Sequence, residues 1–64
     1  MKYDFEFYYE ERTAFAHTKE KALEIFRKGG FYKAVCYFVG ESPTWFRILE
    51  TEGDITSLKQ EEQA

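Results

Sequence analysis

The residues that could carry out chemistry are few and lie far apart along the chain. His17 is the only histidine and Cys36 the only cysteine, so a catalytic triad or a Cys–His pair would have to use them. Cys36 lies within an apolar run, where a thiol is usually an inert, small hydrophobic side chain. One histidine and one cysteine are also too few for a closed zinc site unless carboxylates or a second chain complete it. The sequence therefore predicts no catalytic residue and no metal site.

The carboxylate pairs and the glycine pair also have structural explanations. Glu10-Glu11 and Glu61-Glu62 are adjacent in sequence, whereas acid–base carboxylates must be held apart across a cleft. Gly29-Gly30 lacks the downstream Lys-Ser/Thr of a phosphate-binding loop, and it follows a predicted helix instead of preceding one. We therefore expect solvated carboxylates, a helix that ends at the glycines, no cofactor, and a protein that is not an enzyme.

Length and charge exclude further classes of protein. The chain has 64 residues, which allows one domain. It carries 9 Lys+Arg against 12 Asp+Glu, for a net charge of −3 and a pI of about 5.1. This acidity argues against nucleic acid or anionic lipid as the main partner. No apolar run approaches the roughly 20 residues of a membrane span, and one cysteine forbids an internal disulfide. We expect a cytoplasmic protein without a membrane segment.

Alternating and apolar runs predict four strands. Residues 2–9 alternate, with Tyr3, Phe5, Phe7 and Tyr9 on one face. Residues 13–17 alternate more weakly and are predicted to form the second strand of a hairpin, the alternative being an irregular loop over 10–17. The nearly continuous apolar run over 31–39 predicts a central strand, and residues 44–50, after Pro43, predict a fourth.

A helix separates the two pairs of predicted strands. Thr18 is a suitable N-cap, and the apolar residues of the following segment recur at three- and four-residue spacing over 19–28. Gly29-Gly30 provides its C-terminal stop. We expect this helix to pack on the sheet through Leu23 and Phe26.

The predicted order is β-β-α-β-β, an α+β domain over residues 1–52 with one helix on one face of an antiparallel sheet. Residues 53–64 are polar apart from two isolated apolar side chains. They are predicted to form a polar tail or a short terminal helix, because Ser57 followed by Gln60 imitates a capping box.

The last hairpin decides which side chains remain uncovered. A loop over residues 40–44 would place Phe38 opposite Phe46 and Cys36 opposite Ile48, giving an apolar face for the helix to cover together with Phe5 and Phe7. A loop one residue shorter would distribute the side chains differently. The preferred pairing leaves five residues on the other face as the candidate binding surface: Val35, Tyr37, Trp45, Arg47 and Leu49. The alternative is that these rings only cover the back of the sheet, with Arg47 over Trp45 in a cation–π contact.

Thirteen aromatic rings exceed what so small a core is expected to bury. We therefore expect a non-enzymatic protein-binding module, with a homodimer as the first form of interface. In size, acidity and ring content the chain is similar to small proteins that phages and mobile elements use to inhibit host machinery, an analogy without a shared motif. One alternative is an oligomeric binder of small ligands or nucleotides, with Tyr37, Trp45 and Arg47 stacking a base between subunits. A second is a weak nucleic-acid binder that uses the basic helix.

Overall fold

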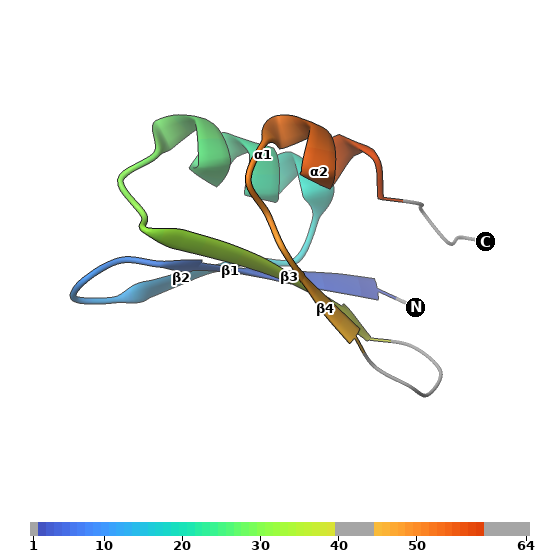
Figure 1. The fold of residues 1–64 in the computed structure, drawn as a ribbon, viewed down its shortest axis with the longest axis horizontal. Coiled ribbons are helices and arrows are strands. Elements are labelled where there is room, and N and C mark those ends of the chain that lie inside the picture. The colour runs from blue at the N-terminus through green and yellow to red at the C-terminus, as the bar shows by residue number, and fades with distance from the viewer. Residues whose placement is uncertain (1, 40–44, 59–64) are drawn as a thin grey trace.

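A computed structural model describes residues 2–39 and 45–58 as a four-stranded antiparallel sheet with two helices on one side (Figure 1). The predicted α+β class and antiparallel sheet are confirmed. The strand order across the sheet is β2-β1-β3-β4. The elements in chain order are β1 (Lys2–Tyr8), β2 (Thr13–Ala16), α1 (Lys19–Lys28), β3 (Lys33–Val39), β4 (Trp45–Ile48) and α2 (Glu52–Thr56). The predicted loop over 40–44 and residues 59–64 of the predicted tail lie outside the described residues.

The first two strands form the predicted hairpin. β1 alternates bulky rings with polar residues, and it pairs antiparallel with both β2 and β3. The backbone N–H of Tyr9 donates to the carbonyl oxygen of Arg12 at 2.8 Å, which closes the turn between β1 and β2. Because Thr13–Ala16 form a strand paired with β1, the alternative of an irregular loop over residues 10–17 is excluded.

The core lies between the sheet and the helices. Phe5 and Phe7 from β1 are fully buried, and so is Ala22 from α1. Leu23 and Phe26 are partly buried against the same core, and the Phe26 ring meets the edge of Phe7 at a centroid distance of 6.5 Å. The predicted packing of the helix is confirmed, although its most buried residue is the small Ala22, which lets the helix backbone approach the sheet closely.

Both ends of α1 lie where the sequence predicts them. The Thr18 hydroxyl accepts a hydrogen bond from the backbone N–H of Lys21 at 3.1 Å. Gly29 and Gly30 have φ angles of 75° and 90°, which a residue without a Cβ adopts at least cost. A Cβ at Gly30 would also lie 3.4 Å from Cε2 of Tyr9, so the glycine allows this ring to pack against the turn.

The second helix differs from the prediction. Thr51 is its N-cap and forms a capping box with Asp54, and Ser57 is its C-cap. The predicted pairing of Ser57 with Gln60 extends beyond the described residues. The Asp54 carboxylate accepts from the backbone N–H groups of Glu50 and Thr51, at 2.7 and 2.9 Å, and this satisfies the donors at the start of the helix.

The two isolated apolar residues that follow residue 53, Ile55 and Leu58, are both buried in the core. Two contacts hold this end of the chain against α1. Arg27 forms an ion pair with Glu52, and the Lys19 ammonium donates to the carbonyl oxygen of Leu58. The short terminal helix therefore completes the cover over one face of the sheet.

Candidate interaction surface

The pairing of β3 with β4 determines which side chains the helices cover. The observed partners are Tyr37 with Phe46, Cys36 with Arg47, and Val35 with Ile48. The predicted register, with Phe38 opposite Phe46 and Cys36 opposite Ile48, is therefore wrong by one residue.

A shift of one residue turns every β4 side chain to the other face. The observed register buries Leu49 in the core, where its N–H donates to the carbonyl oxygen of Ala34 at 2.8 Å. The predicted cover of Phe38, Phe5 and Phe7 by the helices is observed, since all three belong to the core or pack against it. Phe46 and Ile48 instead remain 62% and 52% exposed. Either register places apolar side chains of the segment 45–49 against the core, so apolar burial on this segment alone does not choose between them, and the sequence pattern could not fix the pairing.

The structure divides the five predicted binding residues between different environments. Val35 and Tyr37 lie on the helix-free face, where Val35 is nevertheless buried. Arg47 lies on the helix side, where its Nη1 donates to the carbonyl oxygen of Asp54 at 3.4 Å. Leu49 belongs to the core. The side chain of Trp45 lies outside the described part of the structure, and with it the predicted contact with Arg47.

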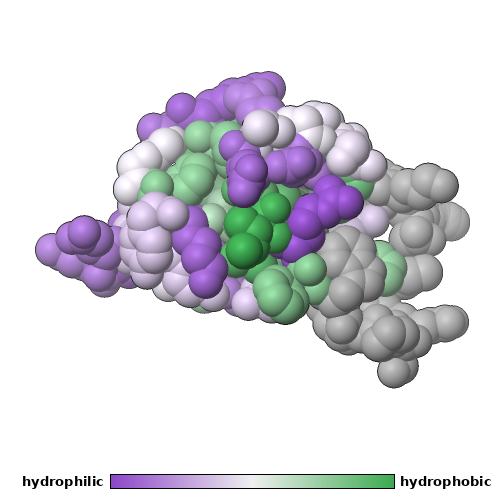
Figure 2. All heavy atoms as spheres, viewed as in Figure 1, coloured by the Kyte–Doolittle hydropathy of each residue, from purple (hydrophilic) through white to green (hydrophobic). Residues whose placement is uncertain are grey.

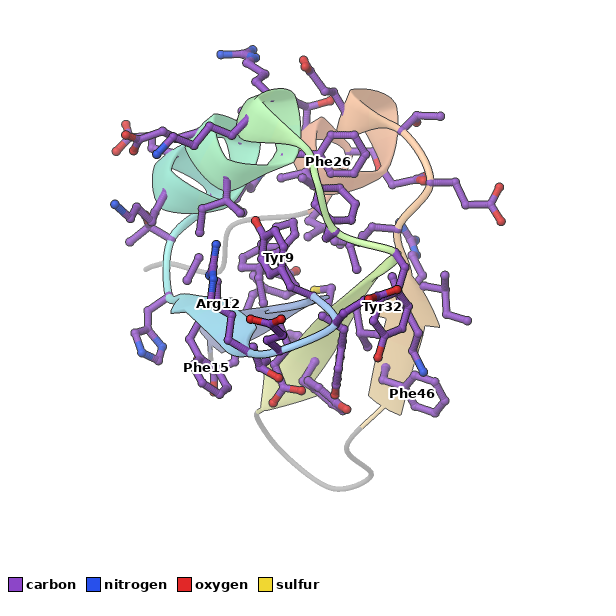
Figure 3. All side chains as sticks on the ribbon, turned by 90° about the vertical axis from the view of Figure 1, so that its left-hand side faces the viewer. Tyr9, Arg12, Phe15, Phe26, Tyr32 and Phe46 are labelled. Carbon is purple, nitrogen blue, oxygen red and sulfur yellow. The ribbon has the colours of Figure 1, made fainter. Side chains whose placement is uncertain are left out.

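The helix-free side of the sheet carries a surface that the sequence predicted only in part, at Val35 and Tyr37. We call it the open face, and among described side chains it comprises Asp4, Glu6, Tyr8, Thr13, Phe15, Lys33, Val35, Tyr37, Phe46 and Ile48. Figure 3 shows Phe15 and Phe46 on the side of the sheet away from Phe26. Phe15 is 58% exposed. The exposure of Phe15 could have been inferred from the sequence. In the alternation of β2, Ala14 and Ala16 are the small residues suited to lie under a helix, which leaves Phe15 on the other face.

Aromatic rings of the open face contact neighbouring rings at two places. Tyr37 of β3 lies 6.1 Å from Phe46 of β4, measured between ring centroids. Tyr8 of β1 lies 6.4 Å from Tyr32, and the Lys33 ammonium is 5.2 Å from the centroid of the Tyr8 ring. These contacts hold the rings in place on a rigid sheet.

The polar groups of the open face are paired with one another. The Tyr8 hydroxyl donates to Oε1 of Glu6 at 2.5 Å. This hydrogen bond, followed by that with Tyr37, raises the pKa of Tyr8 above its ordinary value, so the phenol stays protonated at neutral pH. On the same face Nδ1 of His17 lies 2.8 Å from Oδ1 of Asp4.

The remaining candidates from the sequence are the Cys36 thiol, a metal site and a membrane-spanning segment. Cys36 is fully buried, and its burial raises the pKa of the thiol to about 11. The described residues contain no cluster of His, Cys, Asp or Glu that could hold a metal ion. Among the same residues, no helix has the length and apolarity needed to cross a bilayer.

One hollow of about 270 Å³ lies beside the β1–β2 turn, lined by Tyr9, Glu10, Glu11, Arg12 and Gly30. Its cation is already engaged, because the Arg12 guanidinium stacks over the Tyr9 ring at 3.9 Å (Figure 3). The lining carries both signs of charge, and the volume falls below the roughly 300–1,000 Å³ of ligand sites. The open face is therefore the stronger candidate.

Comparison with known proteins identifies no relative of the chain. No protein-family model, no curated protein and no solved structure matches the chain.

Proposed function

We propose that the chain is a small, non-enzymatic protein-binding module whose contact surface is the open face. The observation that carries this proposal is the exposure of Phe15, Phe46 and Ile48 on a sheet whose other face is covered by two helices. Figure 2, in which the open face is seen edge-on, shows hydrophilic groups on the outer side of the helices and apolar surface at the side of the molecule below them. A sheet face that only met water would carry polar side chains, whereas exposed apolar groups on one face are typical of an interaction site.

The chemistry of the open face suits a protein partner. Its rings are held by contacts with their neighbours, so little side-chain freedom is lost when they are covered. Tyr8 and Tyr37 offer both apolar area and hydroxyl groups, a combination enriched at protein interfaces. Asp4 and Glu6 lie along β1 beside the apolar groups. The partner is therefore expected to present apolar side chains next to hydrogen-bond donors.

Two alternatives from the sequence are less well supported by the geometry. A base-stacking site would need Tyr37 and Arg47 together, yet these residues lie on opposite faces of the sheet. A nucleic-acid site on α1 would depend on its cations, yet two of them are already paired, Lys21 with Glu24 and Arg27 with Glu52. The homodimer and the inhibition of host machinery remain predictions, and the experiment below separates a second copy from a different partner.

The test compares three immobilised proteins: wild type, Phe46→Glu and Lys28→Gln. Both substitutions lower the net charge by the same amount, but Phe46 lies on the open face and Lys28 is an exposed residue of α1. Quantitative capture from a lysate of the source cells, with untagged wild-type chain added, measures what each protein retains. We expect one protein to be retained by wild type and Lys28→Gln and reduced roughly tenfold or more by Phe46→Glu.

Two results would contradict the proposal. Equal retention by Phe46→Glu and wild type would show that the open face is not the contact surface. Equal loss with Phe46→Glu and Lys28→Gln would show that net charge, rather than Phe46, controls the interaction. If the retained protein is the added untagged chain, sedimentation should show a dimer for wild type and a monomer for Phe46→Glu.

A further inference from the structure

The sheet has two free edges among its described strands, and each exposes particular backbone groups. In an antiparallel pair, residues directly opposite one another alternate between hydrogen-bonded and non-hydrogen-bonded pairs. The hydrogen bond from Leu49 to Ala34 identifies the bonded pairs of β3 and β4, so Cys36 and Arg47 form the next one. Phe46 and Ile48 are therefore the β4 residues whose N–H and C=O point away from the sheet.

The β2 edge shows the same alternation. The hydrogen bond from Tyr9 to Arg12 sets the alternation of the β1–β2 pair, so Thr13 and Phe15 of β2 direct their N–H and C=O groups outward. The two edges differ in their side chains. At β4 both outward residues are large, apolar and more than half exposed, whereas at β2 only Phe15 is. Exposed backbone groups beside exposed apolar side chains make β4 the better place for an added strand.

The positive charge of Arg47 indicates which kind of strand β4 could bind. Arg47 lies between Phe46 and Ile48, is exposed, and faces the helix side of the sheet. Its guanidinium donates to the carbonyl oxygen of Asp54 at 3.4 Å, and it also interacts electrostatically with the Asp54 carboxylate, whose own hydrogen bonds are with the backbone of residues 50 and 51. The guanidinium is exposed and forms no salt bridge within 4.0 Å among the described residues. A residue of an added antiparallel strand opposite Arg47 would have its Cβ about 4.5–5.5 Å away, close enough for a direct charge interaction.

A second copy of the chain is a poor occupant of this edge. Two β4 strands related by a twofold axis, with Phe46 of each opposite Ile48 of the other, would place the two Arg47 side chains directly opposite one another. Like charges at such positions are destabilising. Shifting the register to centre on Ile48 would place Phe46 opposite Glu50, whose N–H already donates to the Asp54 carboxylate.

From these observations we propose that β4 binds an extended segment of a different protein by antiparallel strand addition. The segment carries an acidic residue opposite Arg47, flanked by apolar residues that continue the open face beside Phe46 and Ile48. This inference rests on the proposed protein-binding function and specifies the mode and chemistry of the contact. Backbone hydrogen bonds supply the docking geometry, and the alternating side chains supply the selectivity.

The test uses two capped synthetic peptides with the cores Val-Asp-Ile and Val-Lys-Ile between threonines, followed by NMR of the isotope-labelled chain. We expect the acidic peptide to slow hydrogen exchange at the Phe46 and Ile48 amides but not at Thr13 and Phe15. The lysine peptide should bind roughly fivefold more weakly or worse. The variant Arg47→Glu should reverse this order of affinity.

Two proline variants serve as a matched pair. Ile48→Pro removes an outward N–H from β4 and leaves the β3–β4 ladder intact, so we expect peptide binding to be lost while the fold persists. Thr13→Pro removes an outward N–H from β2, at the first residue of its strand, and should leave peptide binding unchanged. Equal affinity of the two peptides, protection at β2, or no amide protection at roughly millimolar peptide would overturn the proposal.

Failure of strand addition is distinguishable from failure of the proposed function. If the acidic peptide shifts side-chain resonances of the open face without slowing the Phe46 and Ile48 amides, strand addition is wrong and a face-on contact is supported. Protection of these amides that rises with protein concentration, without peptide, would identify a second copy as the occupant and also overturn the proposal.

Discussion

The two faces of the sheet use similar residues for different purposes. On the helix side, Phe5 and Phe7 are fully buried, and α1 and α2 cover them. On the open face, Phe15 and Phe46 are more than half exposed, although they belong to strands of the same sheet. The comparison shows that aromatic content alone does not identify a core. The position of each ring depends on strand register and on where the helices lie.

The faces also differ in how their polar groups are used. On the helix side, Asp54 satisfies backbone donors at the start of α2, and Arg27 ties α1 to Glu52. On the open face, the hydrogen bond of Tyr8 with Glu6 joins two residues of one strand and connects no separate elements. The first kind of contact supports the fold, whereas the second kind shapes a surface. Substitutions on the two faces should therefore have different effects on stability.

The largest difference is expected from the same substitution on each face. Phe7→Ala removes a fully buried ring and should lower the free energy of unfolding by about 3–5 kcal/mol. A chain of this size has roughly 3–10 kcal/mol in total, so the variant should be largely unfolded by circular dichroism at room temperature. Phe15→Ala is the matched control and should stay within about 0.5 kcal/mol of wild type. Similar losses for both variants would contradict the distinction between the faces.

A smaller loss is expected where α1 meets the sheet. Phe26 is partly buried and contacts the rings of Phe7 and Phe31. Phe26→Ala should therefore cost about 2 kcal/mol, less than Phe7→Ala, because part of this ring already meets water. Urea denaturation gives both values on one scale. A cooperative transition indistinguishable from wild type would show that α1 does not pack as described.

The contribution of Asp54 is expected to be lost in acid. Its hydrogen bonds from the Glu50 and Thr51 amides lower the pKa of this carboxyl below its ordinary value of 3.8. The charged form is thus favoured in the folded state, so its stabilisation is complete above pH 3.8 and is lost as pH falls through the lower, folded-state pKa. Asp54→Asn should have a melting temperature that depends less on pH in this acidic range. An unchanged pH dependence would contradict the role of the capping box.

Much of the fold could be predicted because local signals agreed with one another. The alternation of residues 2–9 predicted β1, and Thr18 with Gly29 marked the ends of α1. A short terminal helix was one of two alternatives, but it was given Ser57 as its N-cap, although Thr51 and Asp54 have the spacing of a capping box. Gly53 in its first turn and the polar composition that follows hid the burial of Ile55 and Leu58, which depends on contacts with the rest of the fold.

The candidate surface was less predictable for a physical reason. Every residue of the segment 45–49 except Arg47 is apolar, so hydrophobic alternation does not reveal which face it presents. The difference between the two possible registers arises from long-range packing, in which Leu49 enters the core. Tyr37 was assigned to the uncovered face correctly, whereas Phe46 and Ile48 were placed beneath the helix and lie on the open face instead.

The most direct test of the account is the free energy of unfolding of Phe46→Glu, measured by urea denaturation beside wild type. Phe46 is 62% exposed and its main ring contact is with Tyr37, also on the open face. If this face is reserved for a partner, a charge at position 46 should lower stability by less than about 1 kcal/mol. A loss of about 2 kcal/mol or more would mean that the ring holds the fold together, and it would contradict the assignment of the open face as a contact surface.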